Sequence, residues 1–211
     1  VVVGLQALQQ GLDRFVSPGE RILLKPNVLA GEKPENAVTT HPAVLGACAR
    51  LFQFAGAAVS FGDSPCVESP LRGLERAGLH AAGHRAGAAL ADFSTGSSME
   101  NVDGSLVDSF PIAQAVHDCD GMVNLPKMKP HGLTRITGAV KNLFGCVPGK
   151  RKALYHVQFQ DPTAFCQLLV ELALRLKPRL HVMDGVVAMD GNGPRGGDPR
   201  PRGDDHRPRG G

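Results

Sequence analysis

The sequence predicts an α/β protein with a Rossmann-like, largely parallel sheet and helices on both of its faces. Two observations carry this prediction. Short apolar runs alternate along the chain with longer segments in which apolar residues recur every three or four positions, as strands and amphipathic helices do. The chain also has 211 residues, 42% of them hydrophobic, which is enough for one domain with its own core. Strands that alternate with helices favour parallel pairing.

Each expected element is identified from its periodicity and from the residues that begin and end it. Proline and glycine end most elements, and a capping residue followed by proline begins a helix. The expected strands are 21–24, 57–61, 89–90, 121–125 and 180–183. The expected helices are one bearing Leu5, Leu8, Leu12 and Phe15, one from Pro42 with Thr40 as its cap, and those over 70–79, 111–119, 133–144 and 162–176.

The most informative stretch is 124–145, which reads NLPKMKPHGLTRITGAVKNLFG. It crowds four cationic or titratable side chains together, namely Lys127, Lys129, His131 and Lys141. Pro126 and Pro130 keep the segment between them extended. Cationic side chains next to the start of a helix are typical of sites that bind phosphate or carboxylate. The sequence therefore predicts an anion site in this stretch.

The predicted helix over 133–144 has two different faces. Its apolar residues fall on one face at helical spacing: Leu133, Ile136, Val140, Leu143 and Phe144. The other face carries small residues and one long ammonium: Thr134, Thr137, Gly138, Lys141 and Gly145. Such a face would let a ligand approach the helix backbone closely, with Lys141 pointing toward it.

Polar residues follow four of the predicted strands at the point where each strand ends. In a parallel sheet these ends meet at one edge, where ligands of open α/β folds bind. We therefore expect one shared pocket there. The predicted ligand-binding residues are Lys25, Asn27, Asp63, Ser64, Lys129, Thr137, Lys141, Asn142, His156 and Asp184, with His156 in a loop after Gly145. The predicted catalytic residues are His131, His41 and Lys127, with either histidine as acid or base.

These residues also have a purely structural interpretation. Lysines can form a solvated rim, and His131 can be a core histidine with satisfied hydrogen bonds. Asp63 and Asp184 precede Ser and Gly, where aspartate commonly forms turns. If instead they converge, the carboxylates together with His41 and His131 would also suit a divalent metal, although no residue is assigned as a metal ligand.

Composition excludes several classes of function. A formal net charge of +3 is too small to indicate nucleic-acid binding, and no apolar run is long enough to span a bilayer. We expect a cytoplasmic protein. Its cysteines are odd in number, scattered and never spaced C-x-x-C: Cys48, Cys66, Cys119, Cys146 and Cys166. This pattern indicates reduced structural thiols and supplies no zinc or cluster ligands.

Six short motifs, taken in order, resemble the family called domain of unknown function 362. They are LLKPN (23–27), TTHP (39–42), GDSP (62–65), the stretch 124–145, His156 and DGVVAMDGNGPRGGDPRP (184–201). The resemblance covers nearly all of 1–201 and implies a bacterial or archaeal α/β domain that is incomplete at both ends. The remaining tail, 202–211, has no apolar residue to bury, so we expect it to be disordered or an artefact.

The resemblance also bears on cofactors, because many members of that family carry a ferredoxin-like module with two [4Fe-4S] clusters. This chain has no C-x-x-C-x-x-C-x-x-x-C-P run, so any cluster would belong to a missing segment or to a partner. The cofactor itself is not identified.

Two functions remain open from the sequence. The first is a redox-linked, iron-sulfur-associated enzyme that binds a small anionic substrate in a Lys/His/Asp pocket. Clustered ammonium groups lower one another's pKa, which would let a lysine transfer protons near neutral pH. The second is a non-catalytic binding or scaffold domain that presents an anionic ligand, or a cluster, to a partner.

Overall fold

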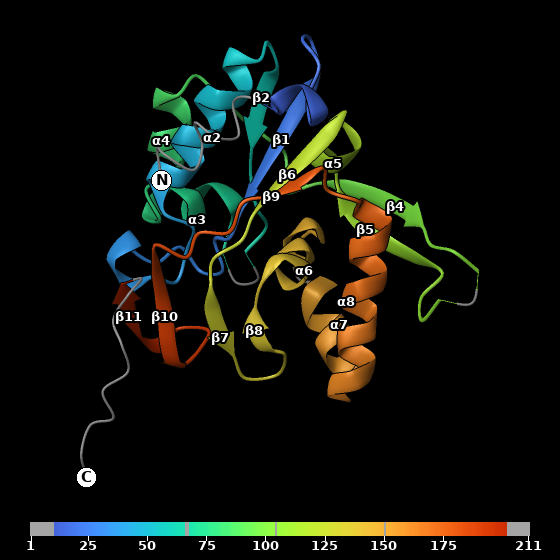
Figure 1. The fold of residues 1–211 in the computed structure, drawn as a ribbon. Coiled ribbons are helices and arrows are strands. Elements are labelled where there is room, and N and C mark those ends of the chain that lie inside the picture. Colours follow the sequence, from blue (N-terminus) through green and yellow to red (C-terminus); the bar gives the residue numbers. More distant parts are fainter. Residues whose placement is uncertain (1–10, 66–67, 104, 150, 202–211) are drawn as a thin grey trace.

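A five-stranded parallel sheet forms the centre of the molecule. It is seen in a computed structural model that describes residues 11–65, 68–103, 105–149 and 151–201 (Figure 1). The strands are β1 (Arg21–Pro26), β2 (Ala58–Phe61), β3 (Ala89–Leu90), β6 (Gly121–Leu125) and β9 (Leu180–His181). They lie in the order β3-β2-β1-β6-β9, a Rossmann-type order with its reversal between β1 and β6. The predicted fold class is confirmed.

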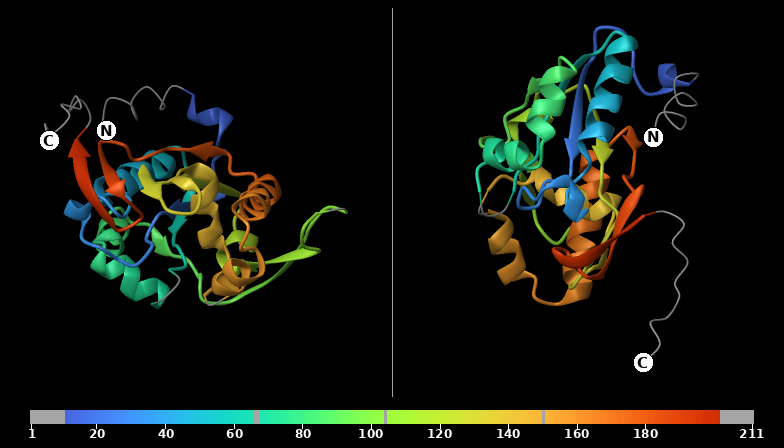
Figure 2. Two further views of the ribbon diagram at one scale, coloured as in Figure 1. Left: turned by 90° about the horizontal axis from the view of Figure 1, so that it is seen from below. Right: turned by 90° about the vertical axis from the view of Figure 1, so that its left-hand side faces the viewer.

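Helices lie on both faces of this sheet (Figures 1 and 2). The helices of the described residues are α2 (Pro42–Phe54), α3 (Pro70–Arg76), α4 (Leu79–Arg85), α5 (Gln114–His117), α6 (Ala139–Asn142), α7 (Arg151–Gln158) and α8 (Pro162–Leu176), and the 3-10 turns are η1 (Leu12–Arg14), η2 (Pro34–Asn36) and η3 (Leu143–Cys146). Of these, α7 lies below the sheet in Figure 1. Successive side chains of a strand point to opposite faces, so β1 contributes to two cores. Ile22 and Leu24 pack in the cluster that includes α2 and α4, whereas Leu23 packs in the cluster that includes η3.

Three antiparallel hairpins complete the described fold. They are β4 (Gly96–Glu100) with β5 (Ser109–Ala113), β7 (Lys129–His131) with β8 (Arg135–Thr137), and β10 (Val187–Asn192) with β11 (Gly196–Pro201). The hairpins β7–β8 and β10–β11 lie below the sheet in Figure 1, at the carboxyl ends of its strands, while β4–β5 extends to the side. Within the described ranges, no helix is long and apolar enough to cross a membrane.

All five expected strands of the sheet are present, and the expected helix over 162–176 matches α8. The residues Leu5 and Leu8 of the first expected helix lie outside the described residues, as do Cys66 and the tail 202–211. The expected cap of α2 was wrong by one residue. His41 caps the helix, its Nδ1 accepting a hydrogen bond from Ala43 N at 3.2 Å. Thr40 turns inward instead, and its hydroxyl donates to the carbonyl of Leu125 at 2.6 Å.

Three further expectations are corrected by the structure. The helix expected over 111–119 is only α5, because Phe110 and Ile112 alternate inward on strand β5 and Pro111 lies between them. The helix expected over 70–79 stops at Arg76, and α4 begins after Gly78, whose φ of 70° breaks the helix. His156 lies on helix α7 instead of in a loop.

The largest correction concerns the helix expected over 133–144. This segment forms strand β8, the single helical turn α6 and the 3-10 turn η3. Ile136 is 49% exposed although it was expected to be buried, and Thr137 on the supposed opposite face is 3% exposed. Ile and Thr are β-branched and pack well in strands, so the run that fitted a helical period also fitted a strand.

The altered assignment of 133–144 gives a stability test. Phe144 is buried against Tyr155 and Phe165, so Phe144→Ala should lower the free energy of unfolding by roughly 3–5 kcal/mol. Ile136→Ala should cost less than about 1 kcal/mol because this side chain is half exposed. Urea denaturation of both variants measures the difference, and equal losses would favour the helical arrangement.

Candidate functional site

A buried ion pair joins the carboxyl ends of β1 and β2. Lys25 is fully buried, and its Nζ donates to Asp63 Oδ1 at 2.7 Å. The carboxylate of Asp63 also accepts hydrogen bonds from the backbone N–H groups of Val28 (2.8 Å) and Ser64 (2.9 Å). Both of its oxygens are therefore occupied, and the pair is electrically neutral.

Gly145 is required for this ion pair. A Cβ at this position would lie 2.0 Å from Asp63 Oδ1 and 2.6 Å from Lys25 Nζ. Such distances are far below van der Waals contact, so no other residue fits without separating the pair. Gly145 thus brings the backbone of η3 against the strand ends.

Three asparagine side chains connect the ion pair to the rest of the edge. Asn142 on α6 donates from Nδ2 to Asn124 Oδ1 at 2.7 Å, and its Oδ1 accepts from Asn27 Nδ2 at 2.8 Å. Asn27 Oδ1 in turn accepts from Lys129 Nζ at 2.8 Å. Because all of these groups are buried, the network fixes their positions.

Lys129 is 2% exposed and holds the end of this network. Its ammonium donates to Asn27 and to the carbonyl of Val38. Burial is the main reason that the pKa of Lys129 falls from 10.5 to about 7. The carboxylate of Asp63 opposes this shift, and nearby ammonium groups such as that of Lys141 add to it. Lys129 therefore changes charge near neutral pH.

His131 lies beside Lys129 as a neutral imidazole. Its Nδ1 accepts hydrogen bonds from the backbone N–H groups of Leu133 (3.2 Å) and Thr134 (3.4 Å), which assigns the ring proton to Nε2. Burial, followed by the nearby charge of Lys141, lowers the pKa of His131 to about 4. At neutral pH His131 is thus suited to donate a hydrogen bond from Nε2, and poorly suited to the predicted acid or base role.

These groups surround a cavity of about 140 Å³, which we call the lysine cavity. Its lining residues are Asn27, Leu29, Asp63, Ser64, Lys129, His131, Thr137, Lys141, Asn142, Phe144, Gly145, Lys152, His156 and Pro194. The Lys141 ammonium lies 5.3 Å from the ring centre of Phe144, and the ring of His156 stacks on Phe165 at 4.6 Å. The pKa of His156 is lowered, chiefly by desolvation.

Three further predicted site residues, His41, Lys127 and Asp184, line a different cavity, of about 290 Å³, which we call the aspartate cavity. The predicted ligand-binding residue Lys25 lines neither cavity. Its lining residues are Pro34, Glu35, His41, Ala43, Val44, Lys127, Asp184, Val186 and Val187. Lys127 Nζ pairs with Asp184 Oδ2 at 2.8 Å, and the same oxygen accepts from the backbone N–H of His41 at 2.8 Å. The single pocket expected from the sequence is thus divided into two cavities at one edge of the sheet.

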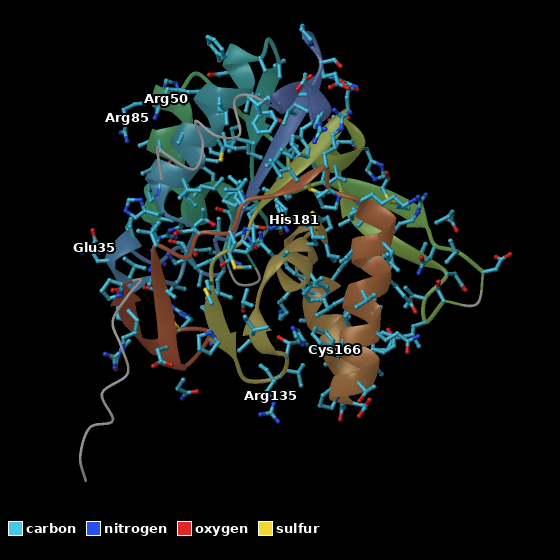
Figure 3. The ribbon with its side chains drawn as sticks, viewed as in Figure 1. Glu35, Arg50, Arg85, Arg135, Cys166 and His181 are labelled. Atoms are coloured by element: carbon cyan, nitrogen blue, oxygen red, sulfur yellow. The ribbon has the colours of Figure 1, made fainter. Side chains whose placement is uncertain are left out.

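Sequence reasoning missed two residues that shape the lysine cavity. Lys152 on α7 is buried, and its ammonium donates to the carbonyl of Ser64. The basic run that starts after Gly149 was its only signal in the sequence, and that run was not used. Asn124 was part of the motif but was assigned no role, although it anchors Asn142 and contacts His181, which lies centrally in Figure 3.

The described cysteines, Cys48, Cys119, Cys146 and Cys166, are free. Cys48 and Cys146 are buried, and burial raises the pKa of each thiol to about 12. Cys166 is exposed on α8 (Figure 3). Across the ranges that the structure describes, no group of three or more His, Cys, Asp or Glu side chains could hold a metal ion.

The strand order and the polar carboxyl edge define a Rossmann-like α/β protein with two cavities beyond its strand ends. The chain belongs to the family described as domain of unknown function (DUF362), whose model matches residues 22–205. It is 39% identical over 191 residues to the thylakoid-associated protein sll1697 of Synechocystis sp.. That alignment covers 90% of this chain and 59% of the relative.

Two solved structures are similar to this chain over part of their length. One is the lactate racemase apoprotein from Thermoanaerobacterium thermosaccharolyticum, with a TM-score of 0.49 and 13% identity over 85% of this chain and 48% of that one. The other is a Thermotoga maritima protein, with a TM-score of 0.49 and 11% identity over 93% and 52% of the two chains.

The contact at Gly145 predicts a large effect of one methyl group. Gly145→Ala should lower the free energy of unfolding by roughly 3–5 kcal/mol, because it separates a buried ion pair. Gly132→Ala is the matched control, since a Cβ there meets nothing within 4 Å. Urea denaturation measures both variants, and a Gly145→Ala protein as stable as the control would contradict the close approach.

Proposed function

We propose that the lysine cavity binds a small oxyanion, a carboxylate or phosphate group of a substrate. One observation carries the proposal, namely the balance of charge around the cavity. Three lysines line it: Lys129, Lys141 and Lys152. Asp63 is the one acid among its described lining residues, and both of its carboxylate oxygens already accept hydrogen bonds from other groups. The field inside the cavity is therefore positive. Two opposite unit charges 4 Å apart attract each other by about 4 kcal/mol at the effective dielectric constant near a protein surface.

Neutral donors add to this positive field. The Nε2–H of His131 and the hydroxyl of Thr137 belong to residues that line the cavity. The Thr137 hydroxyl is buried and has no hydrogen-bond partner among the described residues, so a bound oxygen atom would satisfy it. An oxyanion has several oxygen atoms that can accept hydrogen bonds from different donors, so this mixture of ammonium and neutral donors suits it better than it suits a monatomic anion.

The near-neutral pKa of Lys129 favours an enzyme over a passive binding domain. A proton donor or acceptor works best when its pKa lies near the working pH, and Lys129 meets that condition while lining the cavity. Lys129 therefore takes the proton-transfer role that the sequence had given to His131, His41 and Lys127. Catalysis would be supported if the unaltered protein turns over a substrate and Lys129→Met abolishes that activity. The affinity of this variant for the anion at high pH, where Lys129 is neutral, should equal that of the unaltered protein. A scaffold domain would show binding alone.

The redox link is proposed on the family resemblance. An electron-transfer role needs a cluster from a ferredoxin-like module or partner, and the chain spans 59% of its Synechocystis relative. The cytoplasmic location is likewise a proposal, because that relative is named a thylakoid-associated protein. Iron and sulfide analysis of the anaerobically purified full-length protein tests the link.

Removing the charge of Lys141 should weaken anion binding. We expect Lys141→Gln to reduce the affinity for sulfate or phosphate about tenfold, or 1.4 kcal/mol, with little loss of stability. Lys177→Gln is the matched control, because Lys177 is exposed and lines neither cavity. Calorimetric titration at two salt concentrations should show weaker binding at higher salt. Equal affinities of the two variants would contradict the proposal.

Anion binding should also depend on pH. The pKa of Lys129 is lowered to about 7, so this side chain is mostly charged at pH 6 and mostly neutral at pH 8. Sulfate keeps its charge over this range, and its affinity should rise about tenfold as the pH falls from 8 to 6. Lys129→Met should abolish the dependence. A pH-independent affinity of the unaltered protein would mean that Lys129 does not face the anion.

A further inference from the structure

We infer that the aspartate cavity is a second binding site, and that it takes a neutral organic molecule with hydroxyl groups, of the sugar or polyol type. This inference is independent of the anion site, because the two cavities share no lining residue. The key observation is one oxygen atom. Asp184 is 2% exposed, and its Oδ1 has no hydrogen-bond partner among the described residues.

An unpaired carboxylate oxygen in a buried position is costly unless a donor reaches it. The other oxygen of Asp184 is already occupied by Lys127 Nζ and the backbone N–H of His41. Those two hydrogen bonds fix the orientation of the carboxylate. Rotating the carboxylate to bring Oδ1 toward these donors would break both bonds to Oδ2. Since Asp184 lines a cavity of about 290 Å³, a ligand in that cavity is the group that can supply the donor.

Donors lie around the same cavity. A lysine ammonium has three hydrogens, and the bond to Asp184 uses one of those of Lys127. His41 Nδ1 accepts a hydrogen bond from Ala43 N, so the N–H donor of the ring is at Nε2. The cavity therefore combines one buried acceptor with donors. A hydroxyl group both donates and accepts, and neighbouring hydroxyls on one carbon skeleton match this combination.

Charge argues against ions as ligands here. A cation that approached Asp184 Oδ1 would also meet the Lys127 ammonium, which is paired with the same carboxylate. An anion would meet the carboxylates of Asp184 and Glu35. Glu35 is exposed and lies beside the β10–β11 hairpin (Figure 3). A neutral ligand avoids both conflicts.

The rest of the lining is apolar and suits a carbon skeleton. Val44, Val186, Val187 and Ala43 contribute it, from helix α2 and from the start of β10. A pocket with apolar walls and a few fixed polar groups is typical of small-molecule sites, where the polar groups set the orientation of the ligand.

The test is ligand-observed NMR and calorimetry on the full-length protein, with D-ribose, D-glucose and glycerol as probes and tetrahydropyran as the hydroxyl-free control. We expect at least one hydroxylated probe to bind and tetrahydropyran not to bind. Asp184→Asn, which replaces an acceptor oxygen by a donor, should weaken that binding about tenfold or more. Lys141→Gln, in the lysine cavity, should leave it unchanged.

A second variant guards against a folding defect in Asp184→Asn. Val186 is 52% exposed and lines the cavity, so Val186→Phe should fill the cavity with little effect on stability. It should remove probe binding while sulfate binding persists. The inference is overturned if no hydroxylated probe binds the unaltered protein, or if binding survives Val186→Phe.

Discussion

The buried pair of Lys25 and Asp63 is the interaction on which the carboxyl edge of the sheet depends. It links two neighbouring strand ends through a contact that water cannot reach, and it requires a residue without a side chain at Gly145. Breaking a buried pair leaves an uncompensated charge, which is far more costly than losing an exposed one. The turn after α6 lies against this pair, where the carbonyl of Gly145 accepts a hydrogen bond from Ser64 N at 3.3 Å, and Leu143 packs with Leu23 and Met122 of the sheet.

The ion pair also fixes the positions of groups that line the lysine cavity, through a chain of hydrogen bonds. Asn142 and Asn27 bridge from the ion pair to Lys129, so the lysine is held where water cannot solvate its charge. The low pKa of Lys129 is thus a consequence of the fold and not of the lysine itself. A lysine of the same sequence context on an open surface would stay charged at neutral pH. His131 shows the same effect, because burial, followed by the nearby charge of Lys141, lowers its pKa to about 4.

The sequence allowed the strands and their polar ends to be predicted because apolar runs bounded by Pro, Gly and Asp have few alternative structures. Helix α8 was equally clear, with Asp161 as its cap. The segment around Ile136 was not, since the same residues fit a helical face and a short strand, and the choice depends on pairing with Lys129–His131. Lys152 and the division into two cavities depend on how distant loops pack, and no local pattern encodes that.

The extended segment from Lys127 to Lys129 forms part of the wall of both cavities. Each lysine lines one of them, and Met128 between them is hydrogen-bonded on both sides, to the carbonyl of Asp184 and from the N–H of Met189. Neither lysine can move far without displacing the other through two peptide units. Any coupling between ligands in the two cavities would then be reciprocal. If a ligand in one cavity changes the affinity of the other cavity by some factor, a ligand in the other changes the affinity of the first by the same factor.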